Sequence, residues 1–205
     1  MHWEILDEQR RAFIPSLSWA REEGFYLAGG TALALQLGHR DSIDFDFFKS
    51  GDFDTEKLFA RLLEAIGPSV VKVQEERDTL GVVINGRIKL SIMRYPYPLL
   101  KPLVGADALD LASIADIGCM KLSAITGRGT QKDYVDLYFI LQRIPLKELL
   151  VLCSVKLPQL DRGLILKALA YFDDLEPEPI MYMTGQNIDF EVVKRFLRSQ
   201  AAKEY

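Results

Sequence analysis

The sequence predicts an α+β protein in which a mixed sheet is followed by a helical part. Alternating and turn-bounded apolar segments, typical of strands, lie in the first half of the chain, whereas the residues after Ser113 have helical periodicity. The Asn85-Gly86 pair between two such segments is the strongest short signal of a β-hairpin. We expect a sheet domain over residues 1–105 and a helical part over residues 106–205. The boundary is soft, because the helices can also pack on the sheet as one compact unit.

The elements of the first half are bounded by glycine, proline and capping residues. Gly24, Gly38 and the Gly67-Pro68 pair end the expected helices, and Asp54 is placed to cap the helix that follows it. The expected helices cover residues 5–23 (with a kink at Pro15), 31–37 and 55–66, and the expected strands cover residues 25–28, 43–48, 70–75, 79–84 and 87–93. The second half is expected to contain helices at residues 113–126, 132–143, 146–155, 162–172 and 189–202.

Composition places the chain among ordinary globular proteins. Of its 205 residues, 49% are hydrophobic and 26% are charged, a balance that excludes disorder and collagen-like structure. No apolar run approaches the roughly 18 residues of a membrane span, and no signal peptide is visible, so we expect a cytoplasmic protein with no membrane partner. Cys119 and Cys153 form no disulfide framework and are expected to be reduced core residues. A net charge of −4 excludes constitutive nucleic-acid binding through non-specific phosphate contacts but leaves room for a local basic patch.

The most informative stretch begins with a strand that leads into Gly29, Gly30 and Thr31 at the start of a helix. Glycines let backbone N–H groups approach a phosphate, and a helix N-terminus favours negative charge. We therefore expect these three residues to seat the phosphates of a nucleotide. The alternative for a Gly-Gly pair considered alone is a simple tight turn.

Asp44 and Asp46 follow on a segment that alternates with the apolar residues Ile43, Phe45 and Phe47. Strand geometry places both carboxylates on one face, roughly 7 Å apart at their Cα atoms. Two such carboxylates can hold divalent ions for phosphoryl or nucleotidyl transfer, and oxygen ligands select Mg²⁺ or Mn²⁺. An Asp-x-Asp pair alone is often a solvated sheet face. Aspartate is nevertheless disfavoured in strands, and the two motifs in this order are more specific than either one.

A second group of charged residues lies further along the chain. Lys121 and Arg128 lie on or just after one expected helix, and Lys132, Asp133 and Asp136 open the next. Asp133 and Asp136 are three residues apart and share a helix face. The cations are suited to hold a triphosphate, and the acids to orient or deprotonate an attacking hydroxyl. The alternative is a solvated helix start whose acids complement the helix dipole.

Two further polar residues, His39 and Arg40, follow the glycine that ends the short helix. His39 is expected to cap that helix or to form a hydrogen bond in the loop rather than to act as a base. Arg40 is expected to bridge acids in the same loop.

These residues together resemble the AbiEii/AbiGii toxin family, within the superfamily of minimal and polymerase-β-like nucleotidyltransferases. The resemblance is carried by Gly-Gly-Thr-Ala-Leu from Gly29, Gly-His-Arg from Gly38, Ser-Ile-Asp-Phe-Asp from Ser42, and the group from Lys121 to Asp136. It covers roughly residues 25–143. It implies a nucleotidyltransferase-like mixed sheet flanked by helices, with Asp44 and Asp46 as catalytic metal ligands.

The resemblance also implies an activity and partners. The enzyme is expected to transfer a nucleoside monophosphate from an NTP to a hydroxyl of an RNA such as tRNA, or of a protein. It would do so as the toxin of a type IV toxin–antitoxin system, with an antitoxin protein as partner. Lys121, Asp133 and Asp136 are then expected to be catalytic, and Arg128 and Lys132 to bind the nucleotide.

One departure from the superfamily pattern concerns a third carboxylate, which its enzymes place on a later strand facing Asp-x-Asp. Ile88, Leu90 and Ile92 alternate toward the core, so the corresponding position is expected to be Ser91. If the parity of this strand were shifted by one residue, Glu75 would be the next candidate. A catalytically weak or inactive module that binds an NTP or a partner protein is therefore the rival function. Nucleotidylation of an aminoglycoside or another small molecule is a third.

Overall fold

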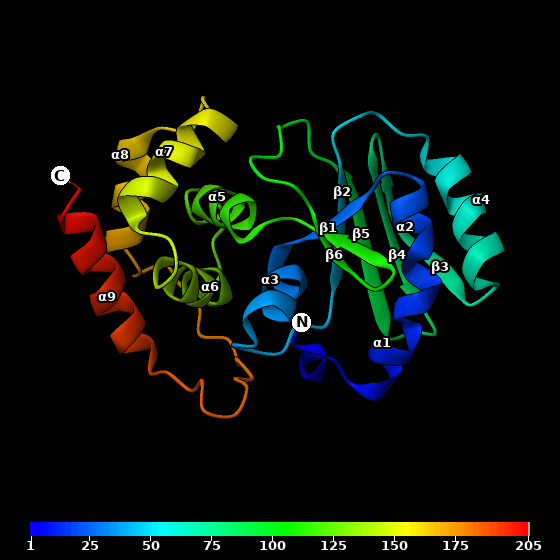
Figure 1. Cartoon of the computed structure of the whole chain (residues 1–205), viewed down its shortest axis with the longest axis horizontal. Coiled ribbons are helices and arrows are strands. Elements are labelled where there is room, and N and C mark those ends of the chain that lie inside the picture. Colours follow the sequence, from blue (N-terminus) through cyan, green and yellow to red (C-terminus); the bar gives the residue numbers. More distant parts are fainter. Residues whose placement is uncertain (205) are drawn as a thin grey trace. The chain divides into compact units, whose positions relative to one another are not determined.

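The computed structural model describes residues 1–204, which divide into two compact units (Figure 1). The sheet unit comprises residues 1–38, 42–98 and 102–112, and the helical unit comprises residues 39–41, 99–101 and the chain from Ser113 onward. The sheet unit thus extends to Ala112, beyond residue 105. It does so because two short strands without a clear sequence signal pair with the sheet in this segment.

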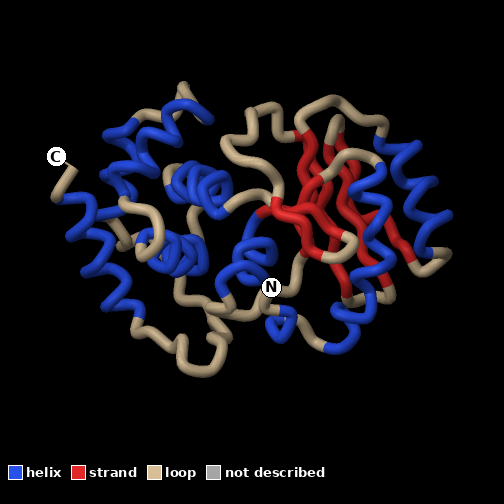
Figure 2. The backbone as a smooth tube through the Cα atoms, in the orientation of Figure 1, coloured by secondary structure: helices blue, strands red, loops and turns tan. Residues whose placement is uncertain are grey.

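Within residues 1–204 the sheet has seven strands, red in Figure 2, in the order β3-β4-β5-β2-β1-β7-β6. The strand bounds are β1 Tyr26–Ala28, β2 Phe45–Lys49, β3 Val70–Glu76, β4 Thr79–Ile84, β5 Ile88–Arg94, β6 Val104–Ala106 and β7 Leu109–Leu111. β2 pairs in parallel with β5, and β1 in parallel with β7, whereas the other neighbours are antiparallel. The mixed sheet confirms the predicted α+β class.

The central strand β2 begins later than the sequence predicts. Its first residue is Phe45, and Ile43 is 52% exposed instead of lying on the core face. Phe45 and Phe47 are buried on one face, as predicted, together with Leu90 of β5. The indole of Trp19 packs 5.2 Å from the ring of Phe47, centroid to centroid. This apolar face forms the core of the sheet unit.

The opening helix of the sheet unit is divided where the kink was expected. After the 3₁₀ turn η1 (Trp3–Ile5), α1 (Glu8–Phe13) and α2 (Ser18–Glu22) are separated by a second 3₁₀ turn, η2 (Ile14–Leu17), which contains Pro15. α3 (Gly29–Leu37) ends at Gly38, whose φ is 65°. The carboxylate of Asp54 caps α4 (Thr55–Ile66) by accepting from the N–H of Lys57 at 3.0 Å. Both of these caps confirm the sequence prediction.

The helical unit contains five α-helices among the described residues: α5 Ile114–Ile125, α6 Gln131–Leu141, α7 Leu146–Lys156, α8 Arg162–Ala170 and α9 Phe190–Ala202. A buried ion pair joins two of them, because Nζ of Lys156 lies 2.9 Å from Oδ1 of Asp116 and both side chains are 0% exposed. Asp116 also accepts from the hydroxyl of Ser113 at 2.6 Å and from the N–H of Leu100 at 2.8 Å. These bonds compensate for the removal of the pair from water.

Cys119 and Cys153 are buried free thiols, as predicted. In residues 1–204, no helix combines the length and apolar character needed to cross a membrane.

Candidate functional site

The turn between β1 and α3 places a helix N-terminus against an acidic side chain. Gly29 has φ of 68°, a left-handed conformation that glycine adopts without strain. A Cβ on Gly29 would lie only 2.8 Å from Oδ2 of Asp46, so the close approach of backbone and carboxylate requires glycine. The first N–H groups of α3 have no acceptor within the helix. The turn is therefore suited to a phosphate whose counter-ion is held by the neighbouring carboxylate.

Asp46 occupies the predicted face of β2. It is half-buried, and the register places it between Ala28 of β1 and Ser91 of β5. Aligned residues on neighbouring strands share a face, so Ser91 lies beside Asp46 at the position expected for a third carboxylate. Leu90 is buried and Ser91 is half-buried, which confirms the predicted parity of β5. Glu75 lies on β3, which two other strands separate from β2.

Asp44 lies one residue before β2 and is exposed. The buried hydroxyl of Thr31 holds this segment in place, because it donates to the backbone carbonyl of Asp44. The same hydroxyl lies 2.7 Å from the hydroxyl of Ser42. The hydroxyl of Thr31 is thus used within the protein. A phosphate contact from Thr31 would have to come from its backbone N–H.

Arg10 of α1 holds the chain at the residue before Asp44. Its Nε donates to the carbonyl of Ile43 at 2.9 Å, and its Nη2 donates to the carbonyl of Arg87 at 3.3 Å. The guanidinium therefore ties together the segments that precede β2 and β5. The carbonyl of Ile43 thus accepts from a side chain two residues before β2 begins. Nothing in the sequence marks Arg10 for this role, since its acceptors are carbonyl groups 33 and 77 residues away.

Asp44 and Asp46 are carboxylates of the kind that could hold a divalent ion. Mg²⁺ prefers oxygen donors and commonly uses one or two carboxylates together with water and substrate phosphates. Among the described residues, no group of three or more His, Cys, Asp or Glu side chains is arranged to hold a metal. The pair therefore fits an ion that is bound together with the phosphates of a nucleotide.

A second cluster lies in the helical unit and is centred on Asp136, which is 0% exposed. Oδ1 of Asp136 is 2.8 Å from Nε2 of His39 and 2.7 Å from Nε of Arg40. Oδ2 of Asp136 is 2.8 Å from Nη2 of Arg40 and 2.7 Å from Nζ of Lys121. Lys121 also lies 2.6 Å from Asp133. We call these five residues the Asp136 cluster.

Burial and charge oppose each other within the Asp136 cluster. Burial alone would raise the pKa of Asp136, but Lys121 and Arg40 outweigh it and hold this pKa well below its ordinary value. Burial would lower the pKa of Lys121, but Asp136 and Asp133 outweigh it and raise this pKa. For His39 burial dominates, and the pKa is lowered despite the hydrogen bond to Asp136. Asp136 is therefore charged, and His39 is neutral at neutral pH.

The side chains of His39 and Arg40 have a different partner from the one that the sequence predicts. Gly38 itself caps α3, and the side chains of His39 and Arg40 both contact Asp136, which is 97 and 96 residues away in the sequence. The Gly-His-Arg motif is the signal that marks these residues. Their partner is set by tertiary packing, so no local pattern reveals it.

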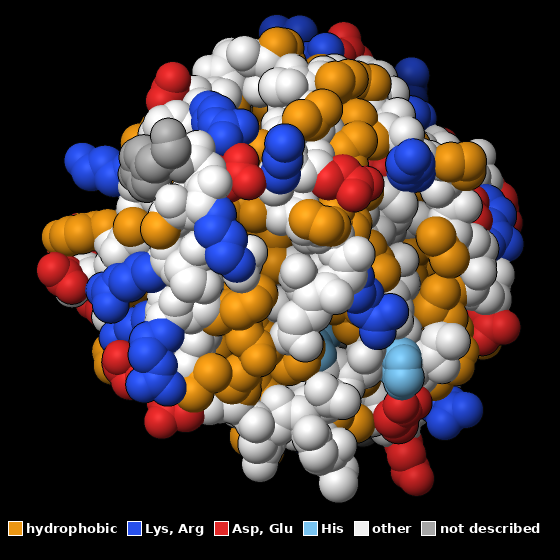
Figure 3. All heavy atoms as spheres, turned by 60° about the vertical axis from the view of Figure 1, so that its left-hand side comes forward, with side chains coloured by type: hydrophobic (Ala, Val, Ile, Leu, Met, Phe, Trp, Pro, Cys, Tyr) orange, Lys and Arg blue, Asp and Glu red, His pale blue; other side chains and the backbone are white. Residues whose placement is uncertain are grey.

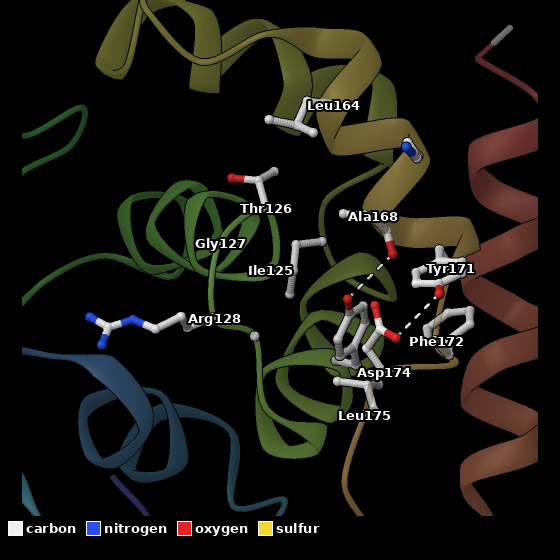
Figure 4. Close-up of a pocket in the computed structure, with 13 residues that line it drawn as sticks. Ile125, Thr126, Gly127, Arg128, Leu164, Ala168, Tyr171, Phe172, Asp174 and Leu175 are labelled. Atoms are coloured by element: carbon white, nitrogen blue, oxygen red, sulfur yellow. Dashed lines mark hydrogen bonds between the residues drawn. The ribbon is translucent and has the colours of Figure 1, made fainter.

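The sequence analysis also selected Lys132 and Arg128, which are not members of the Asp136 cluster. Nζ of Lys132 lies 3.2 Å from the carboxylate of Glu178. Arg128 is exposed on the loop after α5, where it lines a cleft of about 670 Å³. In Figure 4 its side chain points away from Leu164 and Tyr171, which line the other side of the cleft. Arg128 thus lines this cleft while its side chain is exposed to solvent.

The face drawn in Figure 3 carries Lys and Arg side chains, several of them close together at the lower left, along with acidic and apolar side chains. The exposed apolar residues of the helical unit include Val151 and Val155 of α7, which are 59% and 63% exposed.

Comparisons with known proteins identify the fold and the family. Among solved structures, MenT4, a nucleotidyltransferase toxin of Mycobacterium tuberculosis H37Rv, aligns with a TM-score of 0.63 at 18% identity, over 93% of this chain and 80% of its own. JHP933 of Helicobacter pylori aligns with a TM-score of 0.55 at 20% identity, over 97% and 92%. The uncharacterized protein aq_aa25 of Aquifex aeolicus (strain VF5) is 40% identical over 181 residues, 85% of this chain and 86% of that protein.

The similarity to MenT4 defines the class by its fold, that of a nucleotidyltransferase. The family model described as "Nucleotidyl transferase AbiEii toxin, Type IV TA system" matches residues 20–199. The chain therefore belongs to the AbiEii family of nucleotidyltransferase toxins of type IV toxin–antitoxin systems.

We predict that Gly29→Ala damages the site more than the fold. The added methyl group is strained at a positive φ, at about 1–2 kcal/mol, and it also displaces the carboxylate of Asp46. Gly24→Ala is a matched control, because Gly24 has φ of 75° and its Cβ would meet only Cε of Lys49, at 3.9 Å. Both variants should lose similar stability to urea, but only Gly29→Ala should lose NTP affinity in calorimetry. Equal NTP binding by the two variants would contradict this arrangement.

Removing the charge of Asp136 should destabilise the helical unit strongly. Asp136→Asn leaves Arg40 and Lys121 buried with less compensation, and breaking such a buried pair typically costs about 3–5 kcal/mol. Asp133→Asn is the milder comparison, because Asp133 is only half-buried. Urea unfolding followed by circular dichroism measures both. An Asp136→Asn protein as stable as the wild type would show that the cluster contributes little.

The neutral state of His39 predicts a pH dependence of stability. Its folded pKa lies below the ordinary 6.5, so the unfolded chain binds this proton first as the pH falls. The free energy of unfolding should therefore be fully retained above pH 6.5 and decrease as the pH falls toward the folded pKa. Urea unfolding between about pH 5 and pH 7.5 measures this slope. His39→Gln should flatten it and His2→Gln should not, and an unchanged slope in His39→Gln would assign it to other groups.

Proposed function

We propose that this chain transfers a nucleoside monophosphate from an NTP to a hydroxyl of an RNA such as tRNA, or of a protein, with Mg²⁺ or Mn²⁺ held by Asp44 and Asp46. The observation that carries the proposal is the contact between Asp46 and Gly29 at the start of α3. It brings a metal-binding carboxylate next to a helix N-terminus suited to phosphate. Family membership supports nucleotidyl transfer, and the type IV toxin–antitoxin description supports an antitoxin partner.

The proposed reaction is an in-line displacement at the α-phosphorus. The acceptor oxygen forms a new P–O bond, the bond to the oxygen bridging to the β-phosphate breaks, and pyrophosphate leaves with the electron pair. The hydroxyl proton is released to water. The N–H groups of Gly29 and Gly30 bind phosphate oxygens, while Thr31 and Arg10 keep the backbone around Asp44 in place. When bound, the divalent ion neutralises charge on the phosphates.

The proposed cationic contacts of the triphosphate are Lys121, Arg128 and Lys132. Asp136 has N–H donors on both oxygens, so we assign it the role of holding Lys121 and Arg40 rather than of taking a proton. Asp133 shares the ammonium group of Lys121 and has the same supporting role. These carboxylates thus act through the cations that they position.

Ser91 favours a second candidate function, that of a nucleotidyltransferase fold that binds an NTP or a partner protein with little or no turnover. Ser91 is a neutral group aligned with Asp46 where superfamily enzymes have a carboxylate. Two fixed carboxylates hold a divalent ion more weakly than three and rely more on substrate phosphates. Binding of an NTP by the wild type with no labelled product for any nucleotide would support this alternative.

We predict that Asp44→Asn and Asp46→Asn each reduce transfer by about a hundredfold or more, because removal of one charge from the metal site costs several kcal/mol of transition-state stabilisation. The assay combines each α-labelled NTP with Mg²⁺ and either total tRNA or cell protein, followed by gel electrophoresis. Asp107→Asn is the control, since Asp107 is an exposed acid of the same unit in a turn. Circular dichroism checks that the variants are folded. Wild-type rates in both site variants would refute the assignment.

A further inference from the structure

The long connection between α8 and α9 is acidic. Residues 171–189 contain five aspartates or glutamates and no lysine or arginine. We call this connection the acidic strap, which leads into α9 in Figure 1. Its residues 181–183 pair with residues 39–41 through two backbone hydrogen bonds of 2.8 and 3.2 Å. The strap is thus anchored to the segment whose side chains contact Asp136.

Glu178 ties the middle of the acidic strap to the first turn of α6. Its carboxylate accepts from the N–H of Lys132 at 2.9 Å and lies 3.2 Å from Nζ of the same residue. Its own N–H donates to the side chain of Gln131 at 3.1 Å. Burial would raise the pKa of Glu178, but the N–H of Lys132 and the hydroxyl of Thr130 outweigh it and lower this pKa. Glu178 is therefore an anion bound at a helix N-terminus.

Two prolines fix how the acidic strap presents Glu178. Pro177 and Pro179 flank it, and a residue that precedes proline is restricted to extended backbone. Residues 176–180 belong to no helix or strand, and within residues 1–204 their hydrogen bonds to α6 come from Glu178. The contact can therefore open without the loss of a helix or a strand.

The carboxylate of Glu178 uses the groups that a phosphate would use. Lys132 is one of the proposed cationic contacts of the triphosphate, and its ammonium group is paired with Glu178. Carboxylates and phosphates both accept from ammonium groups and from N–H groups at a helix N-terminus. The two anions also repel each other at short distance. A nucleotide phosphate that binds Lys132 therefore requires Glu178 to leave.

We propose that the contact between Glu178 and Lys132 is autoinhibitory, in that it holds the acidic strap on the first turn of α6 until the phosphates of an NTP displace it. This inference rests on the proposed contact between Lys132 and the triphosphate. The side chains of Glu178 and Lys132 are 26% and 41% exposed, so water reaches the pair and its opening costs little. The contact thus lowers the affinity for NTP by a modest factor.

The test compares Glu178→Gln with Glu176→Gln in the full-length protein. Glu176 is an exposed acid of the same strap and forms no ion pair within the described residues, so both variants remove one negative charge from the strap. Calorimetry with Mg²⁺ and the α,β-methylene analogue of each NTP measures binding without turnover. Glu178→Gln should bind about three- to tenfold more tightly than the wild type, because a competing and repelling anion is lost. Glu176→Gln should behave as the wild type.

A second pair of variants tests whether the gain passes through Lys132. In the Lys132→Gln background, Glu178→Gln should change the affinity for the analogue by less than about twofold, because the ammonium group for which the two anions compete is absent. An equal gain in both backgrounds would assign the effect of Glu178 to its general charge and overturn the inference.

The remaining outcomes separate this inference from the proposed function. Equal or weaker binding by Glu178→Gln than by the wild type would overturn the inference alone, and no binding by either protein would overturn both. Binding by Glu178→Gln but not by the wild type would support the inference. Gln131→Ala, which frees the N–H of Glu178 without a change of charge, guards against misfolding and should tighten binding in the same direction. Tighter binding by Glu178→Gln with no labelled product from natural NTPs would refute the proposed transfer and leave the autoinhibitory contact standing.

Discussion

The five residues of β2 have to bury aromatic side chains and present an acid to a helix N-terminus at the same time. Alternation meets both requirements, because Phe45 and Phe47 are at most 1% exposed on one face while Asp46 lies on the other. Burial of each phenylalanine contributes about 1.5–3 kcal/mol, which offsets the poor strand propensity of aspartate. The position of β2 between β1 and β5 then decides which residues surround Asp46.

The two aspartates are held by different means. Asp46 is part of the strand ladder, so its position follows from backbone pairing on both sides. Asp44 precedes the ladder, and its segment is held by side chains, the hydroxyl of Thr31 and the guanidinium of Arg10. Individual hydrogen bonds of this kind contribute about 0.5–1.5 kcal/mol. Of the two proposed ligands, Asp44 is thus the more adjustable, which would suit an ion whose coordination is completed by substrate phosphates.

The Asp136 cluster is balanced in charge. With His39 neutral, the positive charges of Arg40 and Lys121 are matched by the negative charges of Asp133 and Asp136. Protonation of His39 would add an uncompensated buried charge, which is the physical reason for its lowered pKa. The cluster also orders residues 39–41 within the helical unit, because His39 and Arg40 both contact Asp136. A buried network of this kind depends on all of its members, since the loss of one leaves its partners unpaired.

The sequence by itself determined the features that depend on neighbours along the chain. These include the Gly-Gly turn before a helix, the caps at Gly38 and Asp54, the alternation in β2 and β5, and the helices of the second half. Only the tertiary structure decided the start of β2 at Phe45, the role of Arg10, the convergence of His39 and Arg40 on Asp136, and the alignment of Ser91 with Asp46. The short strands β6 and β7 belong to this second group, because their pairing with the sheet defines them. Each of these features is a contact between residues distant in sequence, and its energy comes from burial and pairing that no local pattern records.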